Sequence, residues 1–179
     1  YLSEISKNRL FPDIVIILDE ESTINNLPGK LLEYSSKNII DNQWPEANFD
    51  PTASLFDWIK ELDLNFVVAG SRDINDSKVI NILASFDVDM FVYSGYGGAI
   101  LRDKILSIGK MFLHIHGGYL PKYKGSTTNY YSILGSGYIG ASAILLTKEI
   151  DSGPIIKRIK TKAPIRKDMI DHIYDSAIR

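Results

Sequence analysis

The segment with the clearest chemical character holds two histidines one residue apart, His114 and His116, directly after an apolar run. Residues i and i+2 of an extended strand point to the same face, so the two imidazoles are expected side by side. Open α/β sheets hold their ligands at the carboxyl ends of the strands, and we expect the pair to lie there. Because imidazole titrates near neutrality, the chemistry expected of the pair is proton transfer.

Two further features follow this pair along the chain. The segment continues after His116 as Gly-Gly-Tyr-Leu-Pro-Lys-Tyr-Lys-Gly, which combines a turn with a basic loop. Asp151 then lies in an Asp-Ser-Gly-Pro stretch that ordinary turn chemistry predicts to be a loop. The commonest role of such an aspartate is a hydrogen bond to its own backbone, but its spacing from His116 favours a role in the site.

Taken together, these residues resemble a known family, the formyltransferases that use 10-formyltetrahydrofolate. The family pattern is Asn-x-His-Pro-x-x-Leu-Pro-x-x-Arg-Gly followed by Asp-x-Gly, and the resemblance runs from about Asp89 to Ile159. Members include glycinamide ribonucleotide transformylase, methionyl-tRNA formyltransferase and the sugar N-formyltransferases. A match of this length is far more specific than a lone three-residue motif.

The resemblance implies an N-formyltransferase with His114, His116 and Asp151 as its catalytic residues. His116 is expected to transfer a proton to or from the reacting amine and to stabilise a developing oxyanion. Asp151 is expected to orient an imidazole or to assist a water that shuttles protons. His114 departs from the family, which has Asn there as a donor to the formyl oxygen; a neutral imidazole replaces that donor in one tautomer alone.

Other readings of these residues stay open. Without the flanking motif, a histidine that hydrogen-bonds the end of a strand is the commoner role of His116. The His114 substitution leaves open a non-catalytic folate-binding or regulatory domain. Two histidines and Asp151 also match a two-His-one-carboxylate site, and hence a metal-assisted hydrolase. Since the motif already accounts for all three residues, we expect no metal.

The resemblance also implies where the formyl donor, 10-formyltetrahydrofolate, binds. A Gly-rich turn at residues 95–100 follows an apolar strand but lacks the Gly-x-Gly-x-x-Gly spacing of dinucleotide sites. Its glycines allow close approach to a flat ligand, although a plain strand-to-helix turn is equally consistent with the spacing. The expected folate-binding residues are Gly97, Gly98, Ala99 and Ile100, facing Leu146, Thr147, Lys148 and Glu149.

The formyl acceptor is expected to bind after His116. The candidates are Tyr119, Lys122, Lys124, Gly125 and Thr128. A basic loop can contact a phosphate, and a solvated surface loop is the alternative. Similarity of residues 119 and 127–131 to the sugar formyltransferases favours a nucleotide-linked amino sugar. Methionyl-tRNA is the second candidate acceptor.

Composition sets broad limits on this function. The chain has 179 residues, a net charge of −2 and no Cys. The chain has no overall excess of positive charge that would favour binding to nucleic acid, although a local basic patch and a tRNA partner stay open. Absence of Cys excludes thiolate chemistry and suits a reducing compartment, so we expect a cytoplasmic protein. We expect folate and a small-molecule amine as partners and no membrane; a homodimer stays open.

The pattern of elements predicts an α/β fold with a Rossmann-like, largely parallel sheet. Continuous apolar runs predict buried strands at residues 13–19, 65–69, 89–93 and 111–115. Helices are predicted at residues 2–9, 30–36, 53–62, 76–86, 100–108 and 128–134, the third capped by Thr52. Two β-rich runs, 142–147 and 154–161, predict a β-hairpin extension around Asp151.

The two ends of the chain indicate a longer protein. By resemblance, a first strand and a Gly-rich turn should precede the helix at residues 2–9. The amphipathic pattern from Asp168 to Arg179, which includes His172, has no stop signal. We therefore expect residues 1–179 to form a single formyltransferase-like catalytic domain that lacks its first strand and any C-terminal domain.

Overall fold

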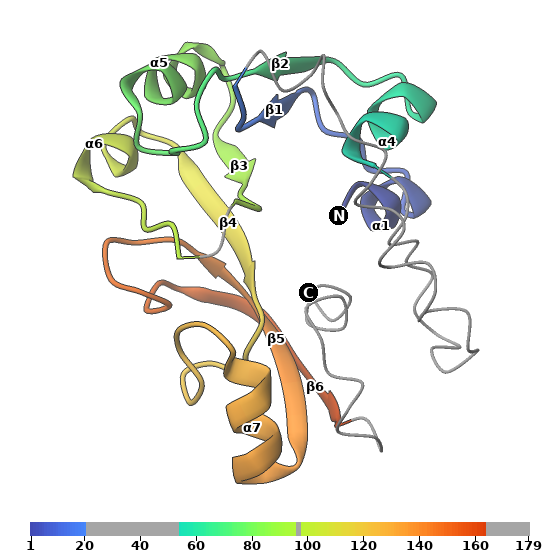
Figure 1. Ribbon diagram of the computed structural model, residues 1–179, viewed down its shortest axis with the longest axis vertical. Helices are drawn as coiled ribbons and strands as arrows, with labels where there is room; N and C mark the ends of the chain where they lie inside the picture. The colour runs from blue at the N-terminus through green and yellow to red at the C-terminus, as the bar shows by residue number, and fades with distance from the viewer. Residues whose placement is uncertain (21–53, 96–97, 164–179) are drawn as a thin grey trace. The chain divides into compact units, whose positions relative to one another are not determined.

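The computed structural model describes residues 1–20, 54–95 and 98–163 and groups the chain into two compact units, residues 1–72 and 73–179 (Figure 1). Both units combine strands with helices, as the sequence pattern predicts. In the part of the chain so described, no helix is both long enough and apolar enough to cross a membrane.

The first unit contains a two-stranded parallel sheet. Strand β1 (Val15–Ile17) pairs with β2 (Phe66–Val68), and Ile16 lies opposite Val67. The elements around this sheet are the helices α1 (Leu2–Lys7) and α4 (Leu55–Glu61). Both strands are shorter than the apolar runs that predict them.

The N-terminus of α4 corrects one prediction, because its cap is Ser54 and not Thr52. The Ser54 hydroxyl accepts from the Asp57 backbone N–H at 3.1 Å, and the Asp57 carboxylate accepts from the Ser54 N–H at 3.1 Å. This capping box satisfies two donors that the helix leaves free. The hydrogen bonds from Ser54 also lower the pKa of the Asp57 carboxyl.

The second unit is built on a four-stranded sheet in the order β3-β4-β5-β6 (Figure 1). The strands are β3 (Met90–Val92), β4 (Met111–His116), β5 (Tyr138–Leu145) and β6 (Ile155–Lys162). The pair β3–β4 is parallel, whereas β4–β5 and β5–β6 are antiparallel. The predicted α/β fold, parallel in its first part with a hairpin around Asp151, is therefore confirmed.

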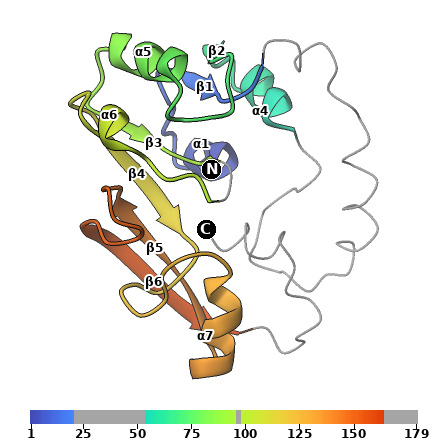
Figure 2. The ribbon, with the colours of Figure 1, turned by 60° about the vertical axis from the view of Figure 1, so that its left-hand side comes forward.

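Three helices belong to this unit: α5 (Ser77–Ser85), α6 (Asp103–Leu106) and α7 (Thr128–Ser136). Asp76 caps α5, because its side chain accepts from the Lys78 backbone N–H at 2.8 Å. Helix α7 lies beside the β5–β6 hairpin (Figure 2) and packs against β5. Its last residue is followed by Gly137, whose positive φ of 67° gives the left-handed C-cap that glycine favours.

The predicted helix at residues 100–108 is wrong in its length. The Asn75 side chain donates to the Ile100 carbonyl at 2.9 Å and accepts from the Arg102 N–H at 2.8 Å. A helix that starts at residue 100 needs the Ile100 carbonyl for its own hydrogen bond, and the Asn75 side chain instead caps the Arg102 N–H. Gly109 has a positive φ of 79° beyond the other end. Helix α6 is consequently confined to four residues.

Some predictions fall outside the described residues. They are the helix at residues 30–36, the folate-binding role of Gly97, and the terminal pattern at 168–179 with His172.

Candidate active site

The carboxyl ends of β3 and β4 place the two histidines. His114 pairs in register with Ile144, and His116 pairs with Ser142, both on the antiparallel neighbour β5. His114 and His116 thus share one face of β4, as their spacing predicts. Tyr93, one residue past β3, lies next to them and donates its backbone N–H to the Leu113 carbonyl at 2.7 Å.

His116 is held between two oxygens. Its side chain is 6% exposed. Its Nε2 lies 2.8 Å from the backbone oxygen of Tyr123, and its Nδ1 lies 3.4 Å from Oδ1 of Asp151. The first distance is a normal hydrogen bond, whereas the second is a longer, mainly electrostatic contact.

These two oxygens restrict the protons on the His116 ring. A carbonyl and an ionised carboxylate both accept and neither donates. Both contacts are therefore satisfied together only when both ring nitrogens carry protons, as an imidazolium beside a carboxylate. In a neutral ring with Nε2 bonded to Tyr123, Nδ1 presents a lone pair to Asp151. The geometry suits a group that holds a proton and passes it on.

Asp151 uses its two carboxylate oxygens for two different partners. While Oδ1 faces His116, Oδ2 accepts the backbone N–H of Gly125 at 2.7 Å. The residue has a left-handed backbone with φ 47°, which Asp tolerates better than most residues. Its side chain is 11% exposed, so the carboxylate is nearly as enclosed as the imidazole.

A second contact joins the same two loops. The Lys124 Nζ donates to the Ser152 Oγ at 2.6 Å, one residue from each partner of the Asp151–Gly125 hydrogen bond. The basic loop after His116 and the hairpin loop that carries Asp151 are thus connected at two adjacent points. The structure therefore brings four predicted residues together: His116, Lys124, Gly125 and Asp151.

His114 has a different environment. Its Nδ1 lies 3.0 Å from the carbonyl oxygen of Tyr93. Because that oxygen only accepts, Nδ1 carries the proton in the neutral ring, and Nε2 then has a lone pair instead of a donor. With this contact made in the neutral ring, His114 differs from the family amide, which donates without a change in protonation.

Tyr93 itself is buried beside His114, with the ring centroids 6.2 Å apart. Its hydroxyl has no hydrogen-bond partner among the residues that the structure describes. Burial raises the pKa of the Tyr93 hydroxyl, and the negative charge of Asp73 raises it further. This group stays neutral near pH 7 and is not a candidate base.

The loop between His116 and α7 depends on residues that the sequence analysis did not single out. Gly118 packs so closely that an added Cβ lies 2.7 Å from both His116 Nε2 and the Tyr123 oxygen. Any larger residue there collides with the His116–Tyr123 hydrogen bond. Ser142 is fully buried, donates to the Gly118 carbonyl at 2.6 Å and accepts from the Leu120 N–H at 3.1 Å.

Thr128, predicted to contact the acceptor, is buried at 3% exposure and donates its hydroxyl to the Gly117 carbonyl. Asn129 beside it is also buried, and its side-chain oxygen accepts from the Gly140 N–H at 3.3 Å. These contacts fix the loop from the side of α7, so in this structure the Thr128 side chain positions the loop. The sequence analysis marks both positions for the acceptor, but no pattern indicates these structural contacts beyond the general preference of polar side chains for helix starts.

We expect Ser142→Ala to destabilise the second unit by about 1–3 kcal/mol, because a buried N–H and a buried C=O both lose their partner. Thermal or urea unfolding measures this change. Ser107→Ala is a suitable control, since Ser107 is exposed and its hydroxyl bonds only the preceding turn at Lys104. Equal stability of the two variants contradicts the role given to Ser142.

The predicted folate-binding residues lie in two places. Gly98, Ala99 and Ile100 are exposed and follow the carboxyl end of β3. Leu146, Thr147 and Lys148 line an open pocket of about 410 Å³ whose other walls come from the start of β4, the end of α6, Leu145 and Pro154. Its lining does not include residues 98–100, and Glu149 is exposed beside it. Lys148 forms an exposed ion pair of 3.1 Å with Asp103.

The remaining acceptor candidates, Tyr119 and Lys122, line a second pocket between the basic loop, α7, β5 and β6.

Regarding metals, the described residues contain no group of three or more His, Cys, Asp or Glu side chains able to hold an ion. The three-ligand hydrolase reading of His114, His116 and Asp151 therefore gains no geometric support.

Comparison with known proteins agrees with this geometry. The family model described as Formyl transferase matches residues 5–177. Methionyl-tRNA formyltransferase of Finegoldia magna is 28% identical over 138 residues, which cover 75% of this chain and 43% of that protein. The bifunctional polymyxin resistance protein ArnA of Wigglesworthia glossinidia brevipalpis is 33% identical over 117 residues, covering 64% of this chain and 18% of that protein. The chain spans less than half the length of both relatives.

A solved structure supports the fold. Phosphoribosylglycinamide formyltransferase of Streptococcus pneumoniae superposes with a TM-score of 0.55 at 21% identity, and the match covers 72% of this chain and 74% of that one. At this identity the likeness concerns the fold alone.

Proposed function

Because the chain belongs to the formyl transferase family, whose members use 10-formyltetrahydrofolate as formyl donor, we propose that it transfers a formyl group from this folate to a primary amine. The observation that carries the proposal is the enclosed His116–Asp151 pair at the carboxyl end of β4. In such a transfer the amine bonds the formyl carbon, the bond from that carbon to the folate nitrogen breaks, and one proton passes from the amine to the folate nitrogen.

The residues of the pair have complementary roles in this proposal. His116 donates hydrogen bonds from a ring held between the Tyr123 oxygen and Asp151, and it can stabilise negative charge that develops on the formyl oxygen. Asp151 keeps the ring oriented and accepts a proton, directly or through a water. Tyr123 contributes only its backbone oxygen, which fixes Nε2 as a donor.

The folate is proposed to bind beside exposed residues 98–100. This segment follows β3 at the sheet edge where α/β proteins hold their ligands. Gly98 has a positive φ of 83°, a conformation that glycine adopts easily. Because glycine has no Cβ, a flat ligand can approach its backbone closely. Residues 146–149 belong to the hairpin loop that also carries Asp151, and we propose that they form the opposite wall.

For the acceptor we propose a nucleotide-linked amino sugar, with methionyl-tRNA as the second candidate. The matches to ArnA and to methionyl-tRNA formyltransferase are compatible with either acceptor. Similarity of Tyr119 and of residues 127–131 to the sugar formyltransferases favours the first. A direct assay with both acceptors and 10-formyltetrahydrofolate decides between them.

Substitution of His114 tests how this chain differs from the family pattern. We expect His114→Asn to preserve or raise kcat, since the amide donates a hydrogen bond in its only protonation state. Initial rates of formyl transfer measure this, with His114→Leu as the matched variant that lacks a donor. Loss of turnover in His114→Asn, with folate still bound, gives His114 a role other than that of an oxyanion donor.

The proposed function is tested first by isothermal titration of the full-length protein with a stable analogue of 10-formyltetrahydrofolate, with and without chelator. Saturable binding that is insensitive to chelator supports the folate site. Absence of binding by the folded protein contradicts the folate site and indicates that the fold binds another ligand. Binding without transfer to any amine supports the non-catalytic folate-binding alternative.

A further inference from the structure

One face of β6 carries a row of cations. Every residue of this strand is exposed. Alternate residues of a strand share a face, so Arg158, Lys160 and Lys162 lie in line. The register places Lys160 opposite Gly140 and Lys162 opposite Tyr138 of β5. Three like charges at this spacing repel one another unless an anion lies among them.

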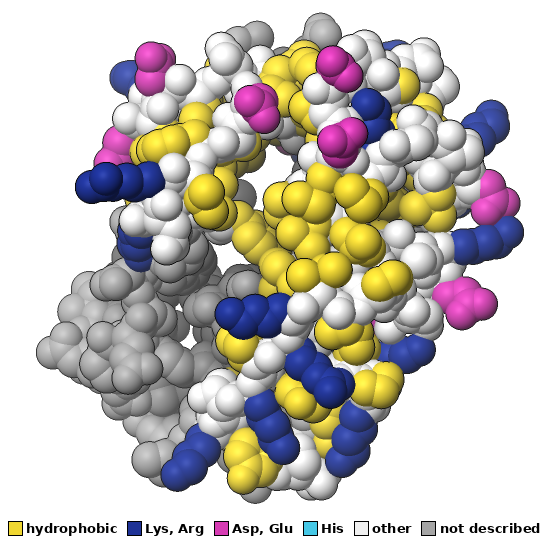
Figure 3. All heavy atoms as spheres, turned by 180° about the vertical axis from the view of Figure 1, so that it is seen from behind, with side chains coloured by type: hydrophobic (Ala, Val, Ile, Leu, Met, Phe, Trp, Pro, Cys, Tyr) yellow, Lys and Arg dark blue, Asp and Glu magenta, His cyan; other side chains and the backbone are white. Residues whose placement is uncertain are grey.

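The surroundings of this row do not neutralise it. Between residues 117 and 163 the sequence has seven Lys and Arg but two acidic residues, Glu149 and Asp151, although the whole chain has a net charge of −2. Viewed from behind, Lys and Arg side chains gather over the lower part of the molecule, where β5 and β6 lie (Figure 3). Within residues 1–20, 54–95 and 98–163, no carboxylate forms an ion pair with Arg158, Lys160 or Lys162.

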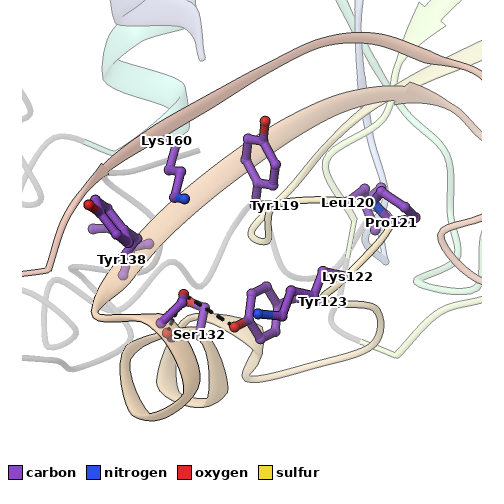
Figure 4. Close-up of a pocket in the computed structure, with 10 residues that line it drawn as sticks. Tyr119, Leu120, Pro121, Lys122, Tyr123, Ser132, Tyr138 and Lys160 are labelled. Atoms are coloured by element: carbon purple, nitrogen blue, oxygen red, sulfur yellow. Dashed lines mark hydrogen bonds between the residues drawn. The ribbon is translucent and has the colours of Figure 1, made fainter.

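One cation of this row, Lys160, lines a pocket of about 170 Å³ together with aromatic rings. Lys160 lies between Tyr119 and Tyr138 (Figure 4), with its Nζ 4.1 Å from the Tyr138 centroid and 5.7 Å from that of Tyr119. The Arg158 guanidinium lies 4.7 Å from the Tyr119 centroid and donates to the Leu120 carbonyl at 2.6 Å. Ring contacts of this kind orient a cation but leave its charge uncompensated.

The pocket adjoins the proposed catalytic pair through one residue. The Tyr123 ring lines the pocket, while its backbone oxygen is bonded to His116. The hydrogen bond with Ser136 lowers the pKa of the Tyr123 hydroxyl, and so do a hydrogen bond with Lys122 and the charges of Lys122 and Lys160. The charges of Lys122 and Lys160, which contribute to this lowering of the pKa, also act on an anion that enters the pocket.

We infer that the pocket lined by Tyr119, Tyr138 and Lys160, with Arg158 stacked on the Tyr119 ring next to it, binds a phosphate group of the formyl acceptor. The inference rests on the proposed function and assigns it a substrate class, a phosphate ester. Arg and Lys are the side chains that recognise phosphate, and tyrosine rings next to them provide surfaces for a sugar or base. Nucleotide-linked amino sugars and aminoacyl-tRNA share this chemistry. Protection of an exposed sheet edge is the other known use of such lysines, and it requires no pocket.

The test is isothermal titration of the full-length protein with inorganic pyrophosphate, without folate, at low and moderate salt. We expect saturable binding that weakens as salt rises. Lys160→Gln should weaken it about tenfold or more, because it removes a charged hydrogen-bond donor. The matched control is Lys157→Gln: Lys157 is exposed on the same strand but on the opposite face, so its variant should bind nearly as well as the wild type.

Two outcomes overturn the inference. One is an absence of pyrophosphate binding by the folded wild type, which indicates that the lysines only protect the sheet edge. The other is an equal loss of affinity in Lys160→Gln and Lys157→Gln, which indicates unspecific attraction. Titrations with uridine diphosphate and with tRNA then distinguish the source of the phosphate, and loss in Lys160→Gln with either ligand supports the site. Because these titrations contain no folate, an absence of pyrophosphate binding does not contradict formyl transfer. An absence of formyl transfer likewise does not contradict the phosphate site.

Discussion

Replacing His116 with Ala is expected to lower kcat at least about a hundredfold, while the folate analogue still binds. General acid–base catalysis by one positioned side chain contributes about 10²–10⁴ in rate. The imidazole is the described side chain that contacts both the Tyr123 oxygen and Asp151, so no neighbour is placed to replace it. Initial rates with 10-formyltetrahydrofolate and the identified acceptor measure the loss.

Since His116 is buried, its removal also affects packing, and the thermal midpoint must be measured beside the rate. His116→Gln is the second variant, because it keeps much of the volume and a donor but cannot carry the proton. Near-normal turnover in both folded variants excludes His116 from proton transfer. A rate loss explained by unfolding alone appears in His116→Ala and not in His116→Gln.

Asp151→Asn is expected to lower kcat by about two orders of magnitude with little change in stability. The amide oxygen can still accept from the Gly125 N–H, and the amide nitrogen can donate to the Nδ1 of a neutral His116. The substitution thus allows both hydrogen bonds and removes the negative charge beside the His116 ring. It separates the charge of Asp151 from its structural role.

The matched control is Asp87→Asn, which removes an exposed carboxylate from the same unit. This variant should keep its rate within about fivefold, the scale of a surface charge. If Asp151→Asn behaves like Asp87→Asn, then Asp151 only ties the hairpin loop to Gly125. Restored activity of Asp151→Glu supports the charged role, since the longer carboxylate can still reach the ring.

The sequence predicts the elements that position the site better than it predicts the contacts within it. Apolar runs locate β1–β4, and the spacing of two β-rich runs locates the hairpin that carries Asp151. Positions at element ends are less certain, as the cap at Ser54 and the short α6 show. The start of α6 depends on the side chain of Asn75, far away along the chain, and local propensity does not contain that information. The Ser54–Asp57 capping box is local, and the prediction missed it by two residues, the usual uncertainty of a helix end.

The contacts that hold the loop after His116 were not predictable. Ser142 reads as an ordinary small residue of a β-rich run, and its importance depends on the register that brings it opposite His116. Gly118 reads as half of a flexible Gly-Gly pair, whereas its role is to leave room for a hydrogen bond. The pocket at Lys160 likewise depends on the register in which β5 pairs with β6. The net charge of the whole chain gives no indication of it.

Four hydrogen bonds around His116 join residues at most 26 positions apart, and this affects how the site assembles. The His116–Tyr123 bond spans 7 residues, the Thr128–Gly117 bond 11, the Ser142–Gly118 bond 24 and the Asp151–Gly125 bond 26. Chain entropy lost on loop closure grows only with the logarithm of length, by about 0.6 kcal/mol for each doubling. The four loops overlap along the chain, so each contact that forms shortens the path that the next one closes, and the site can form stepwise at a low entropic cost.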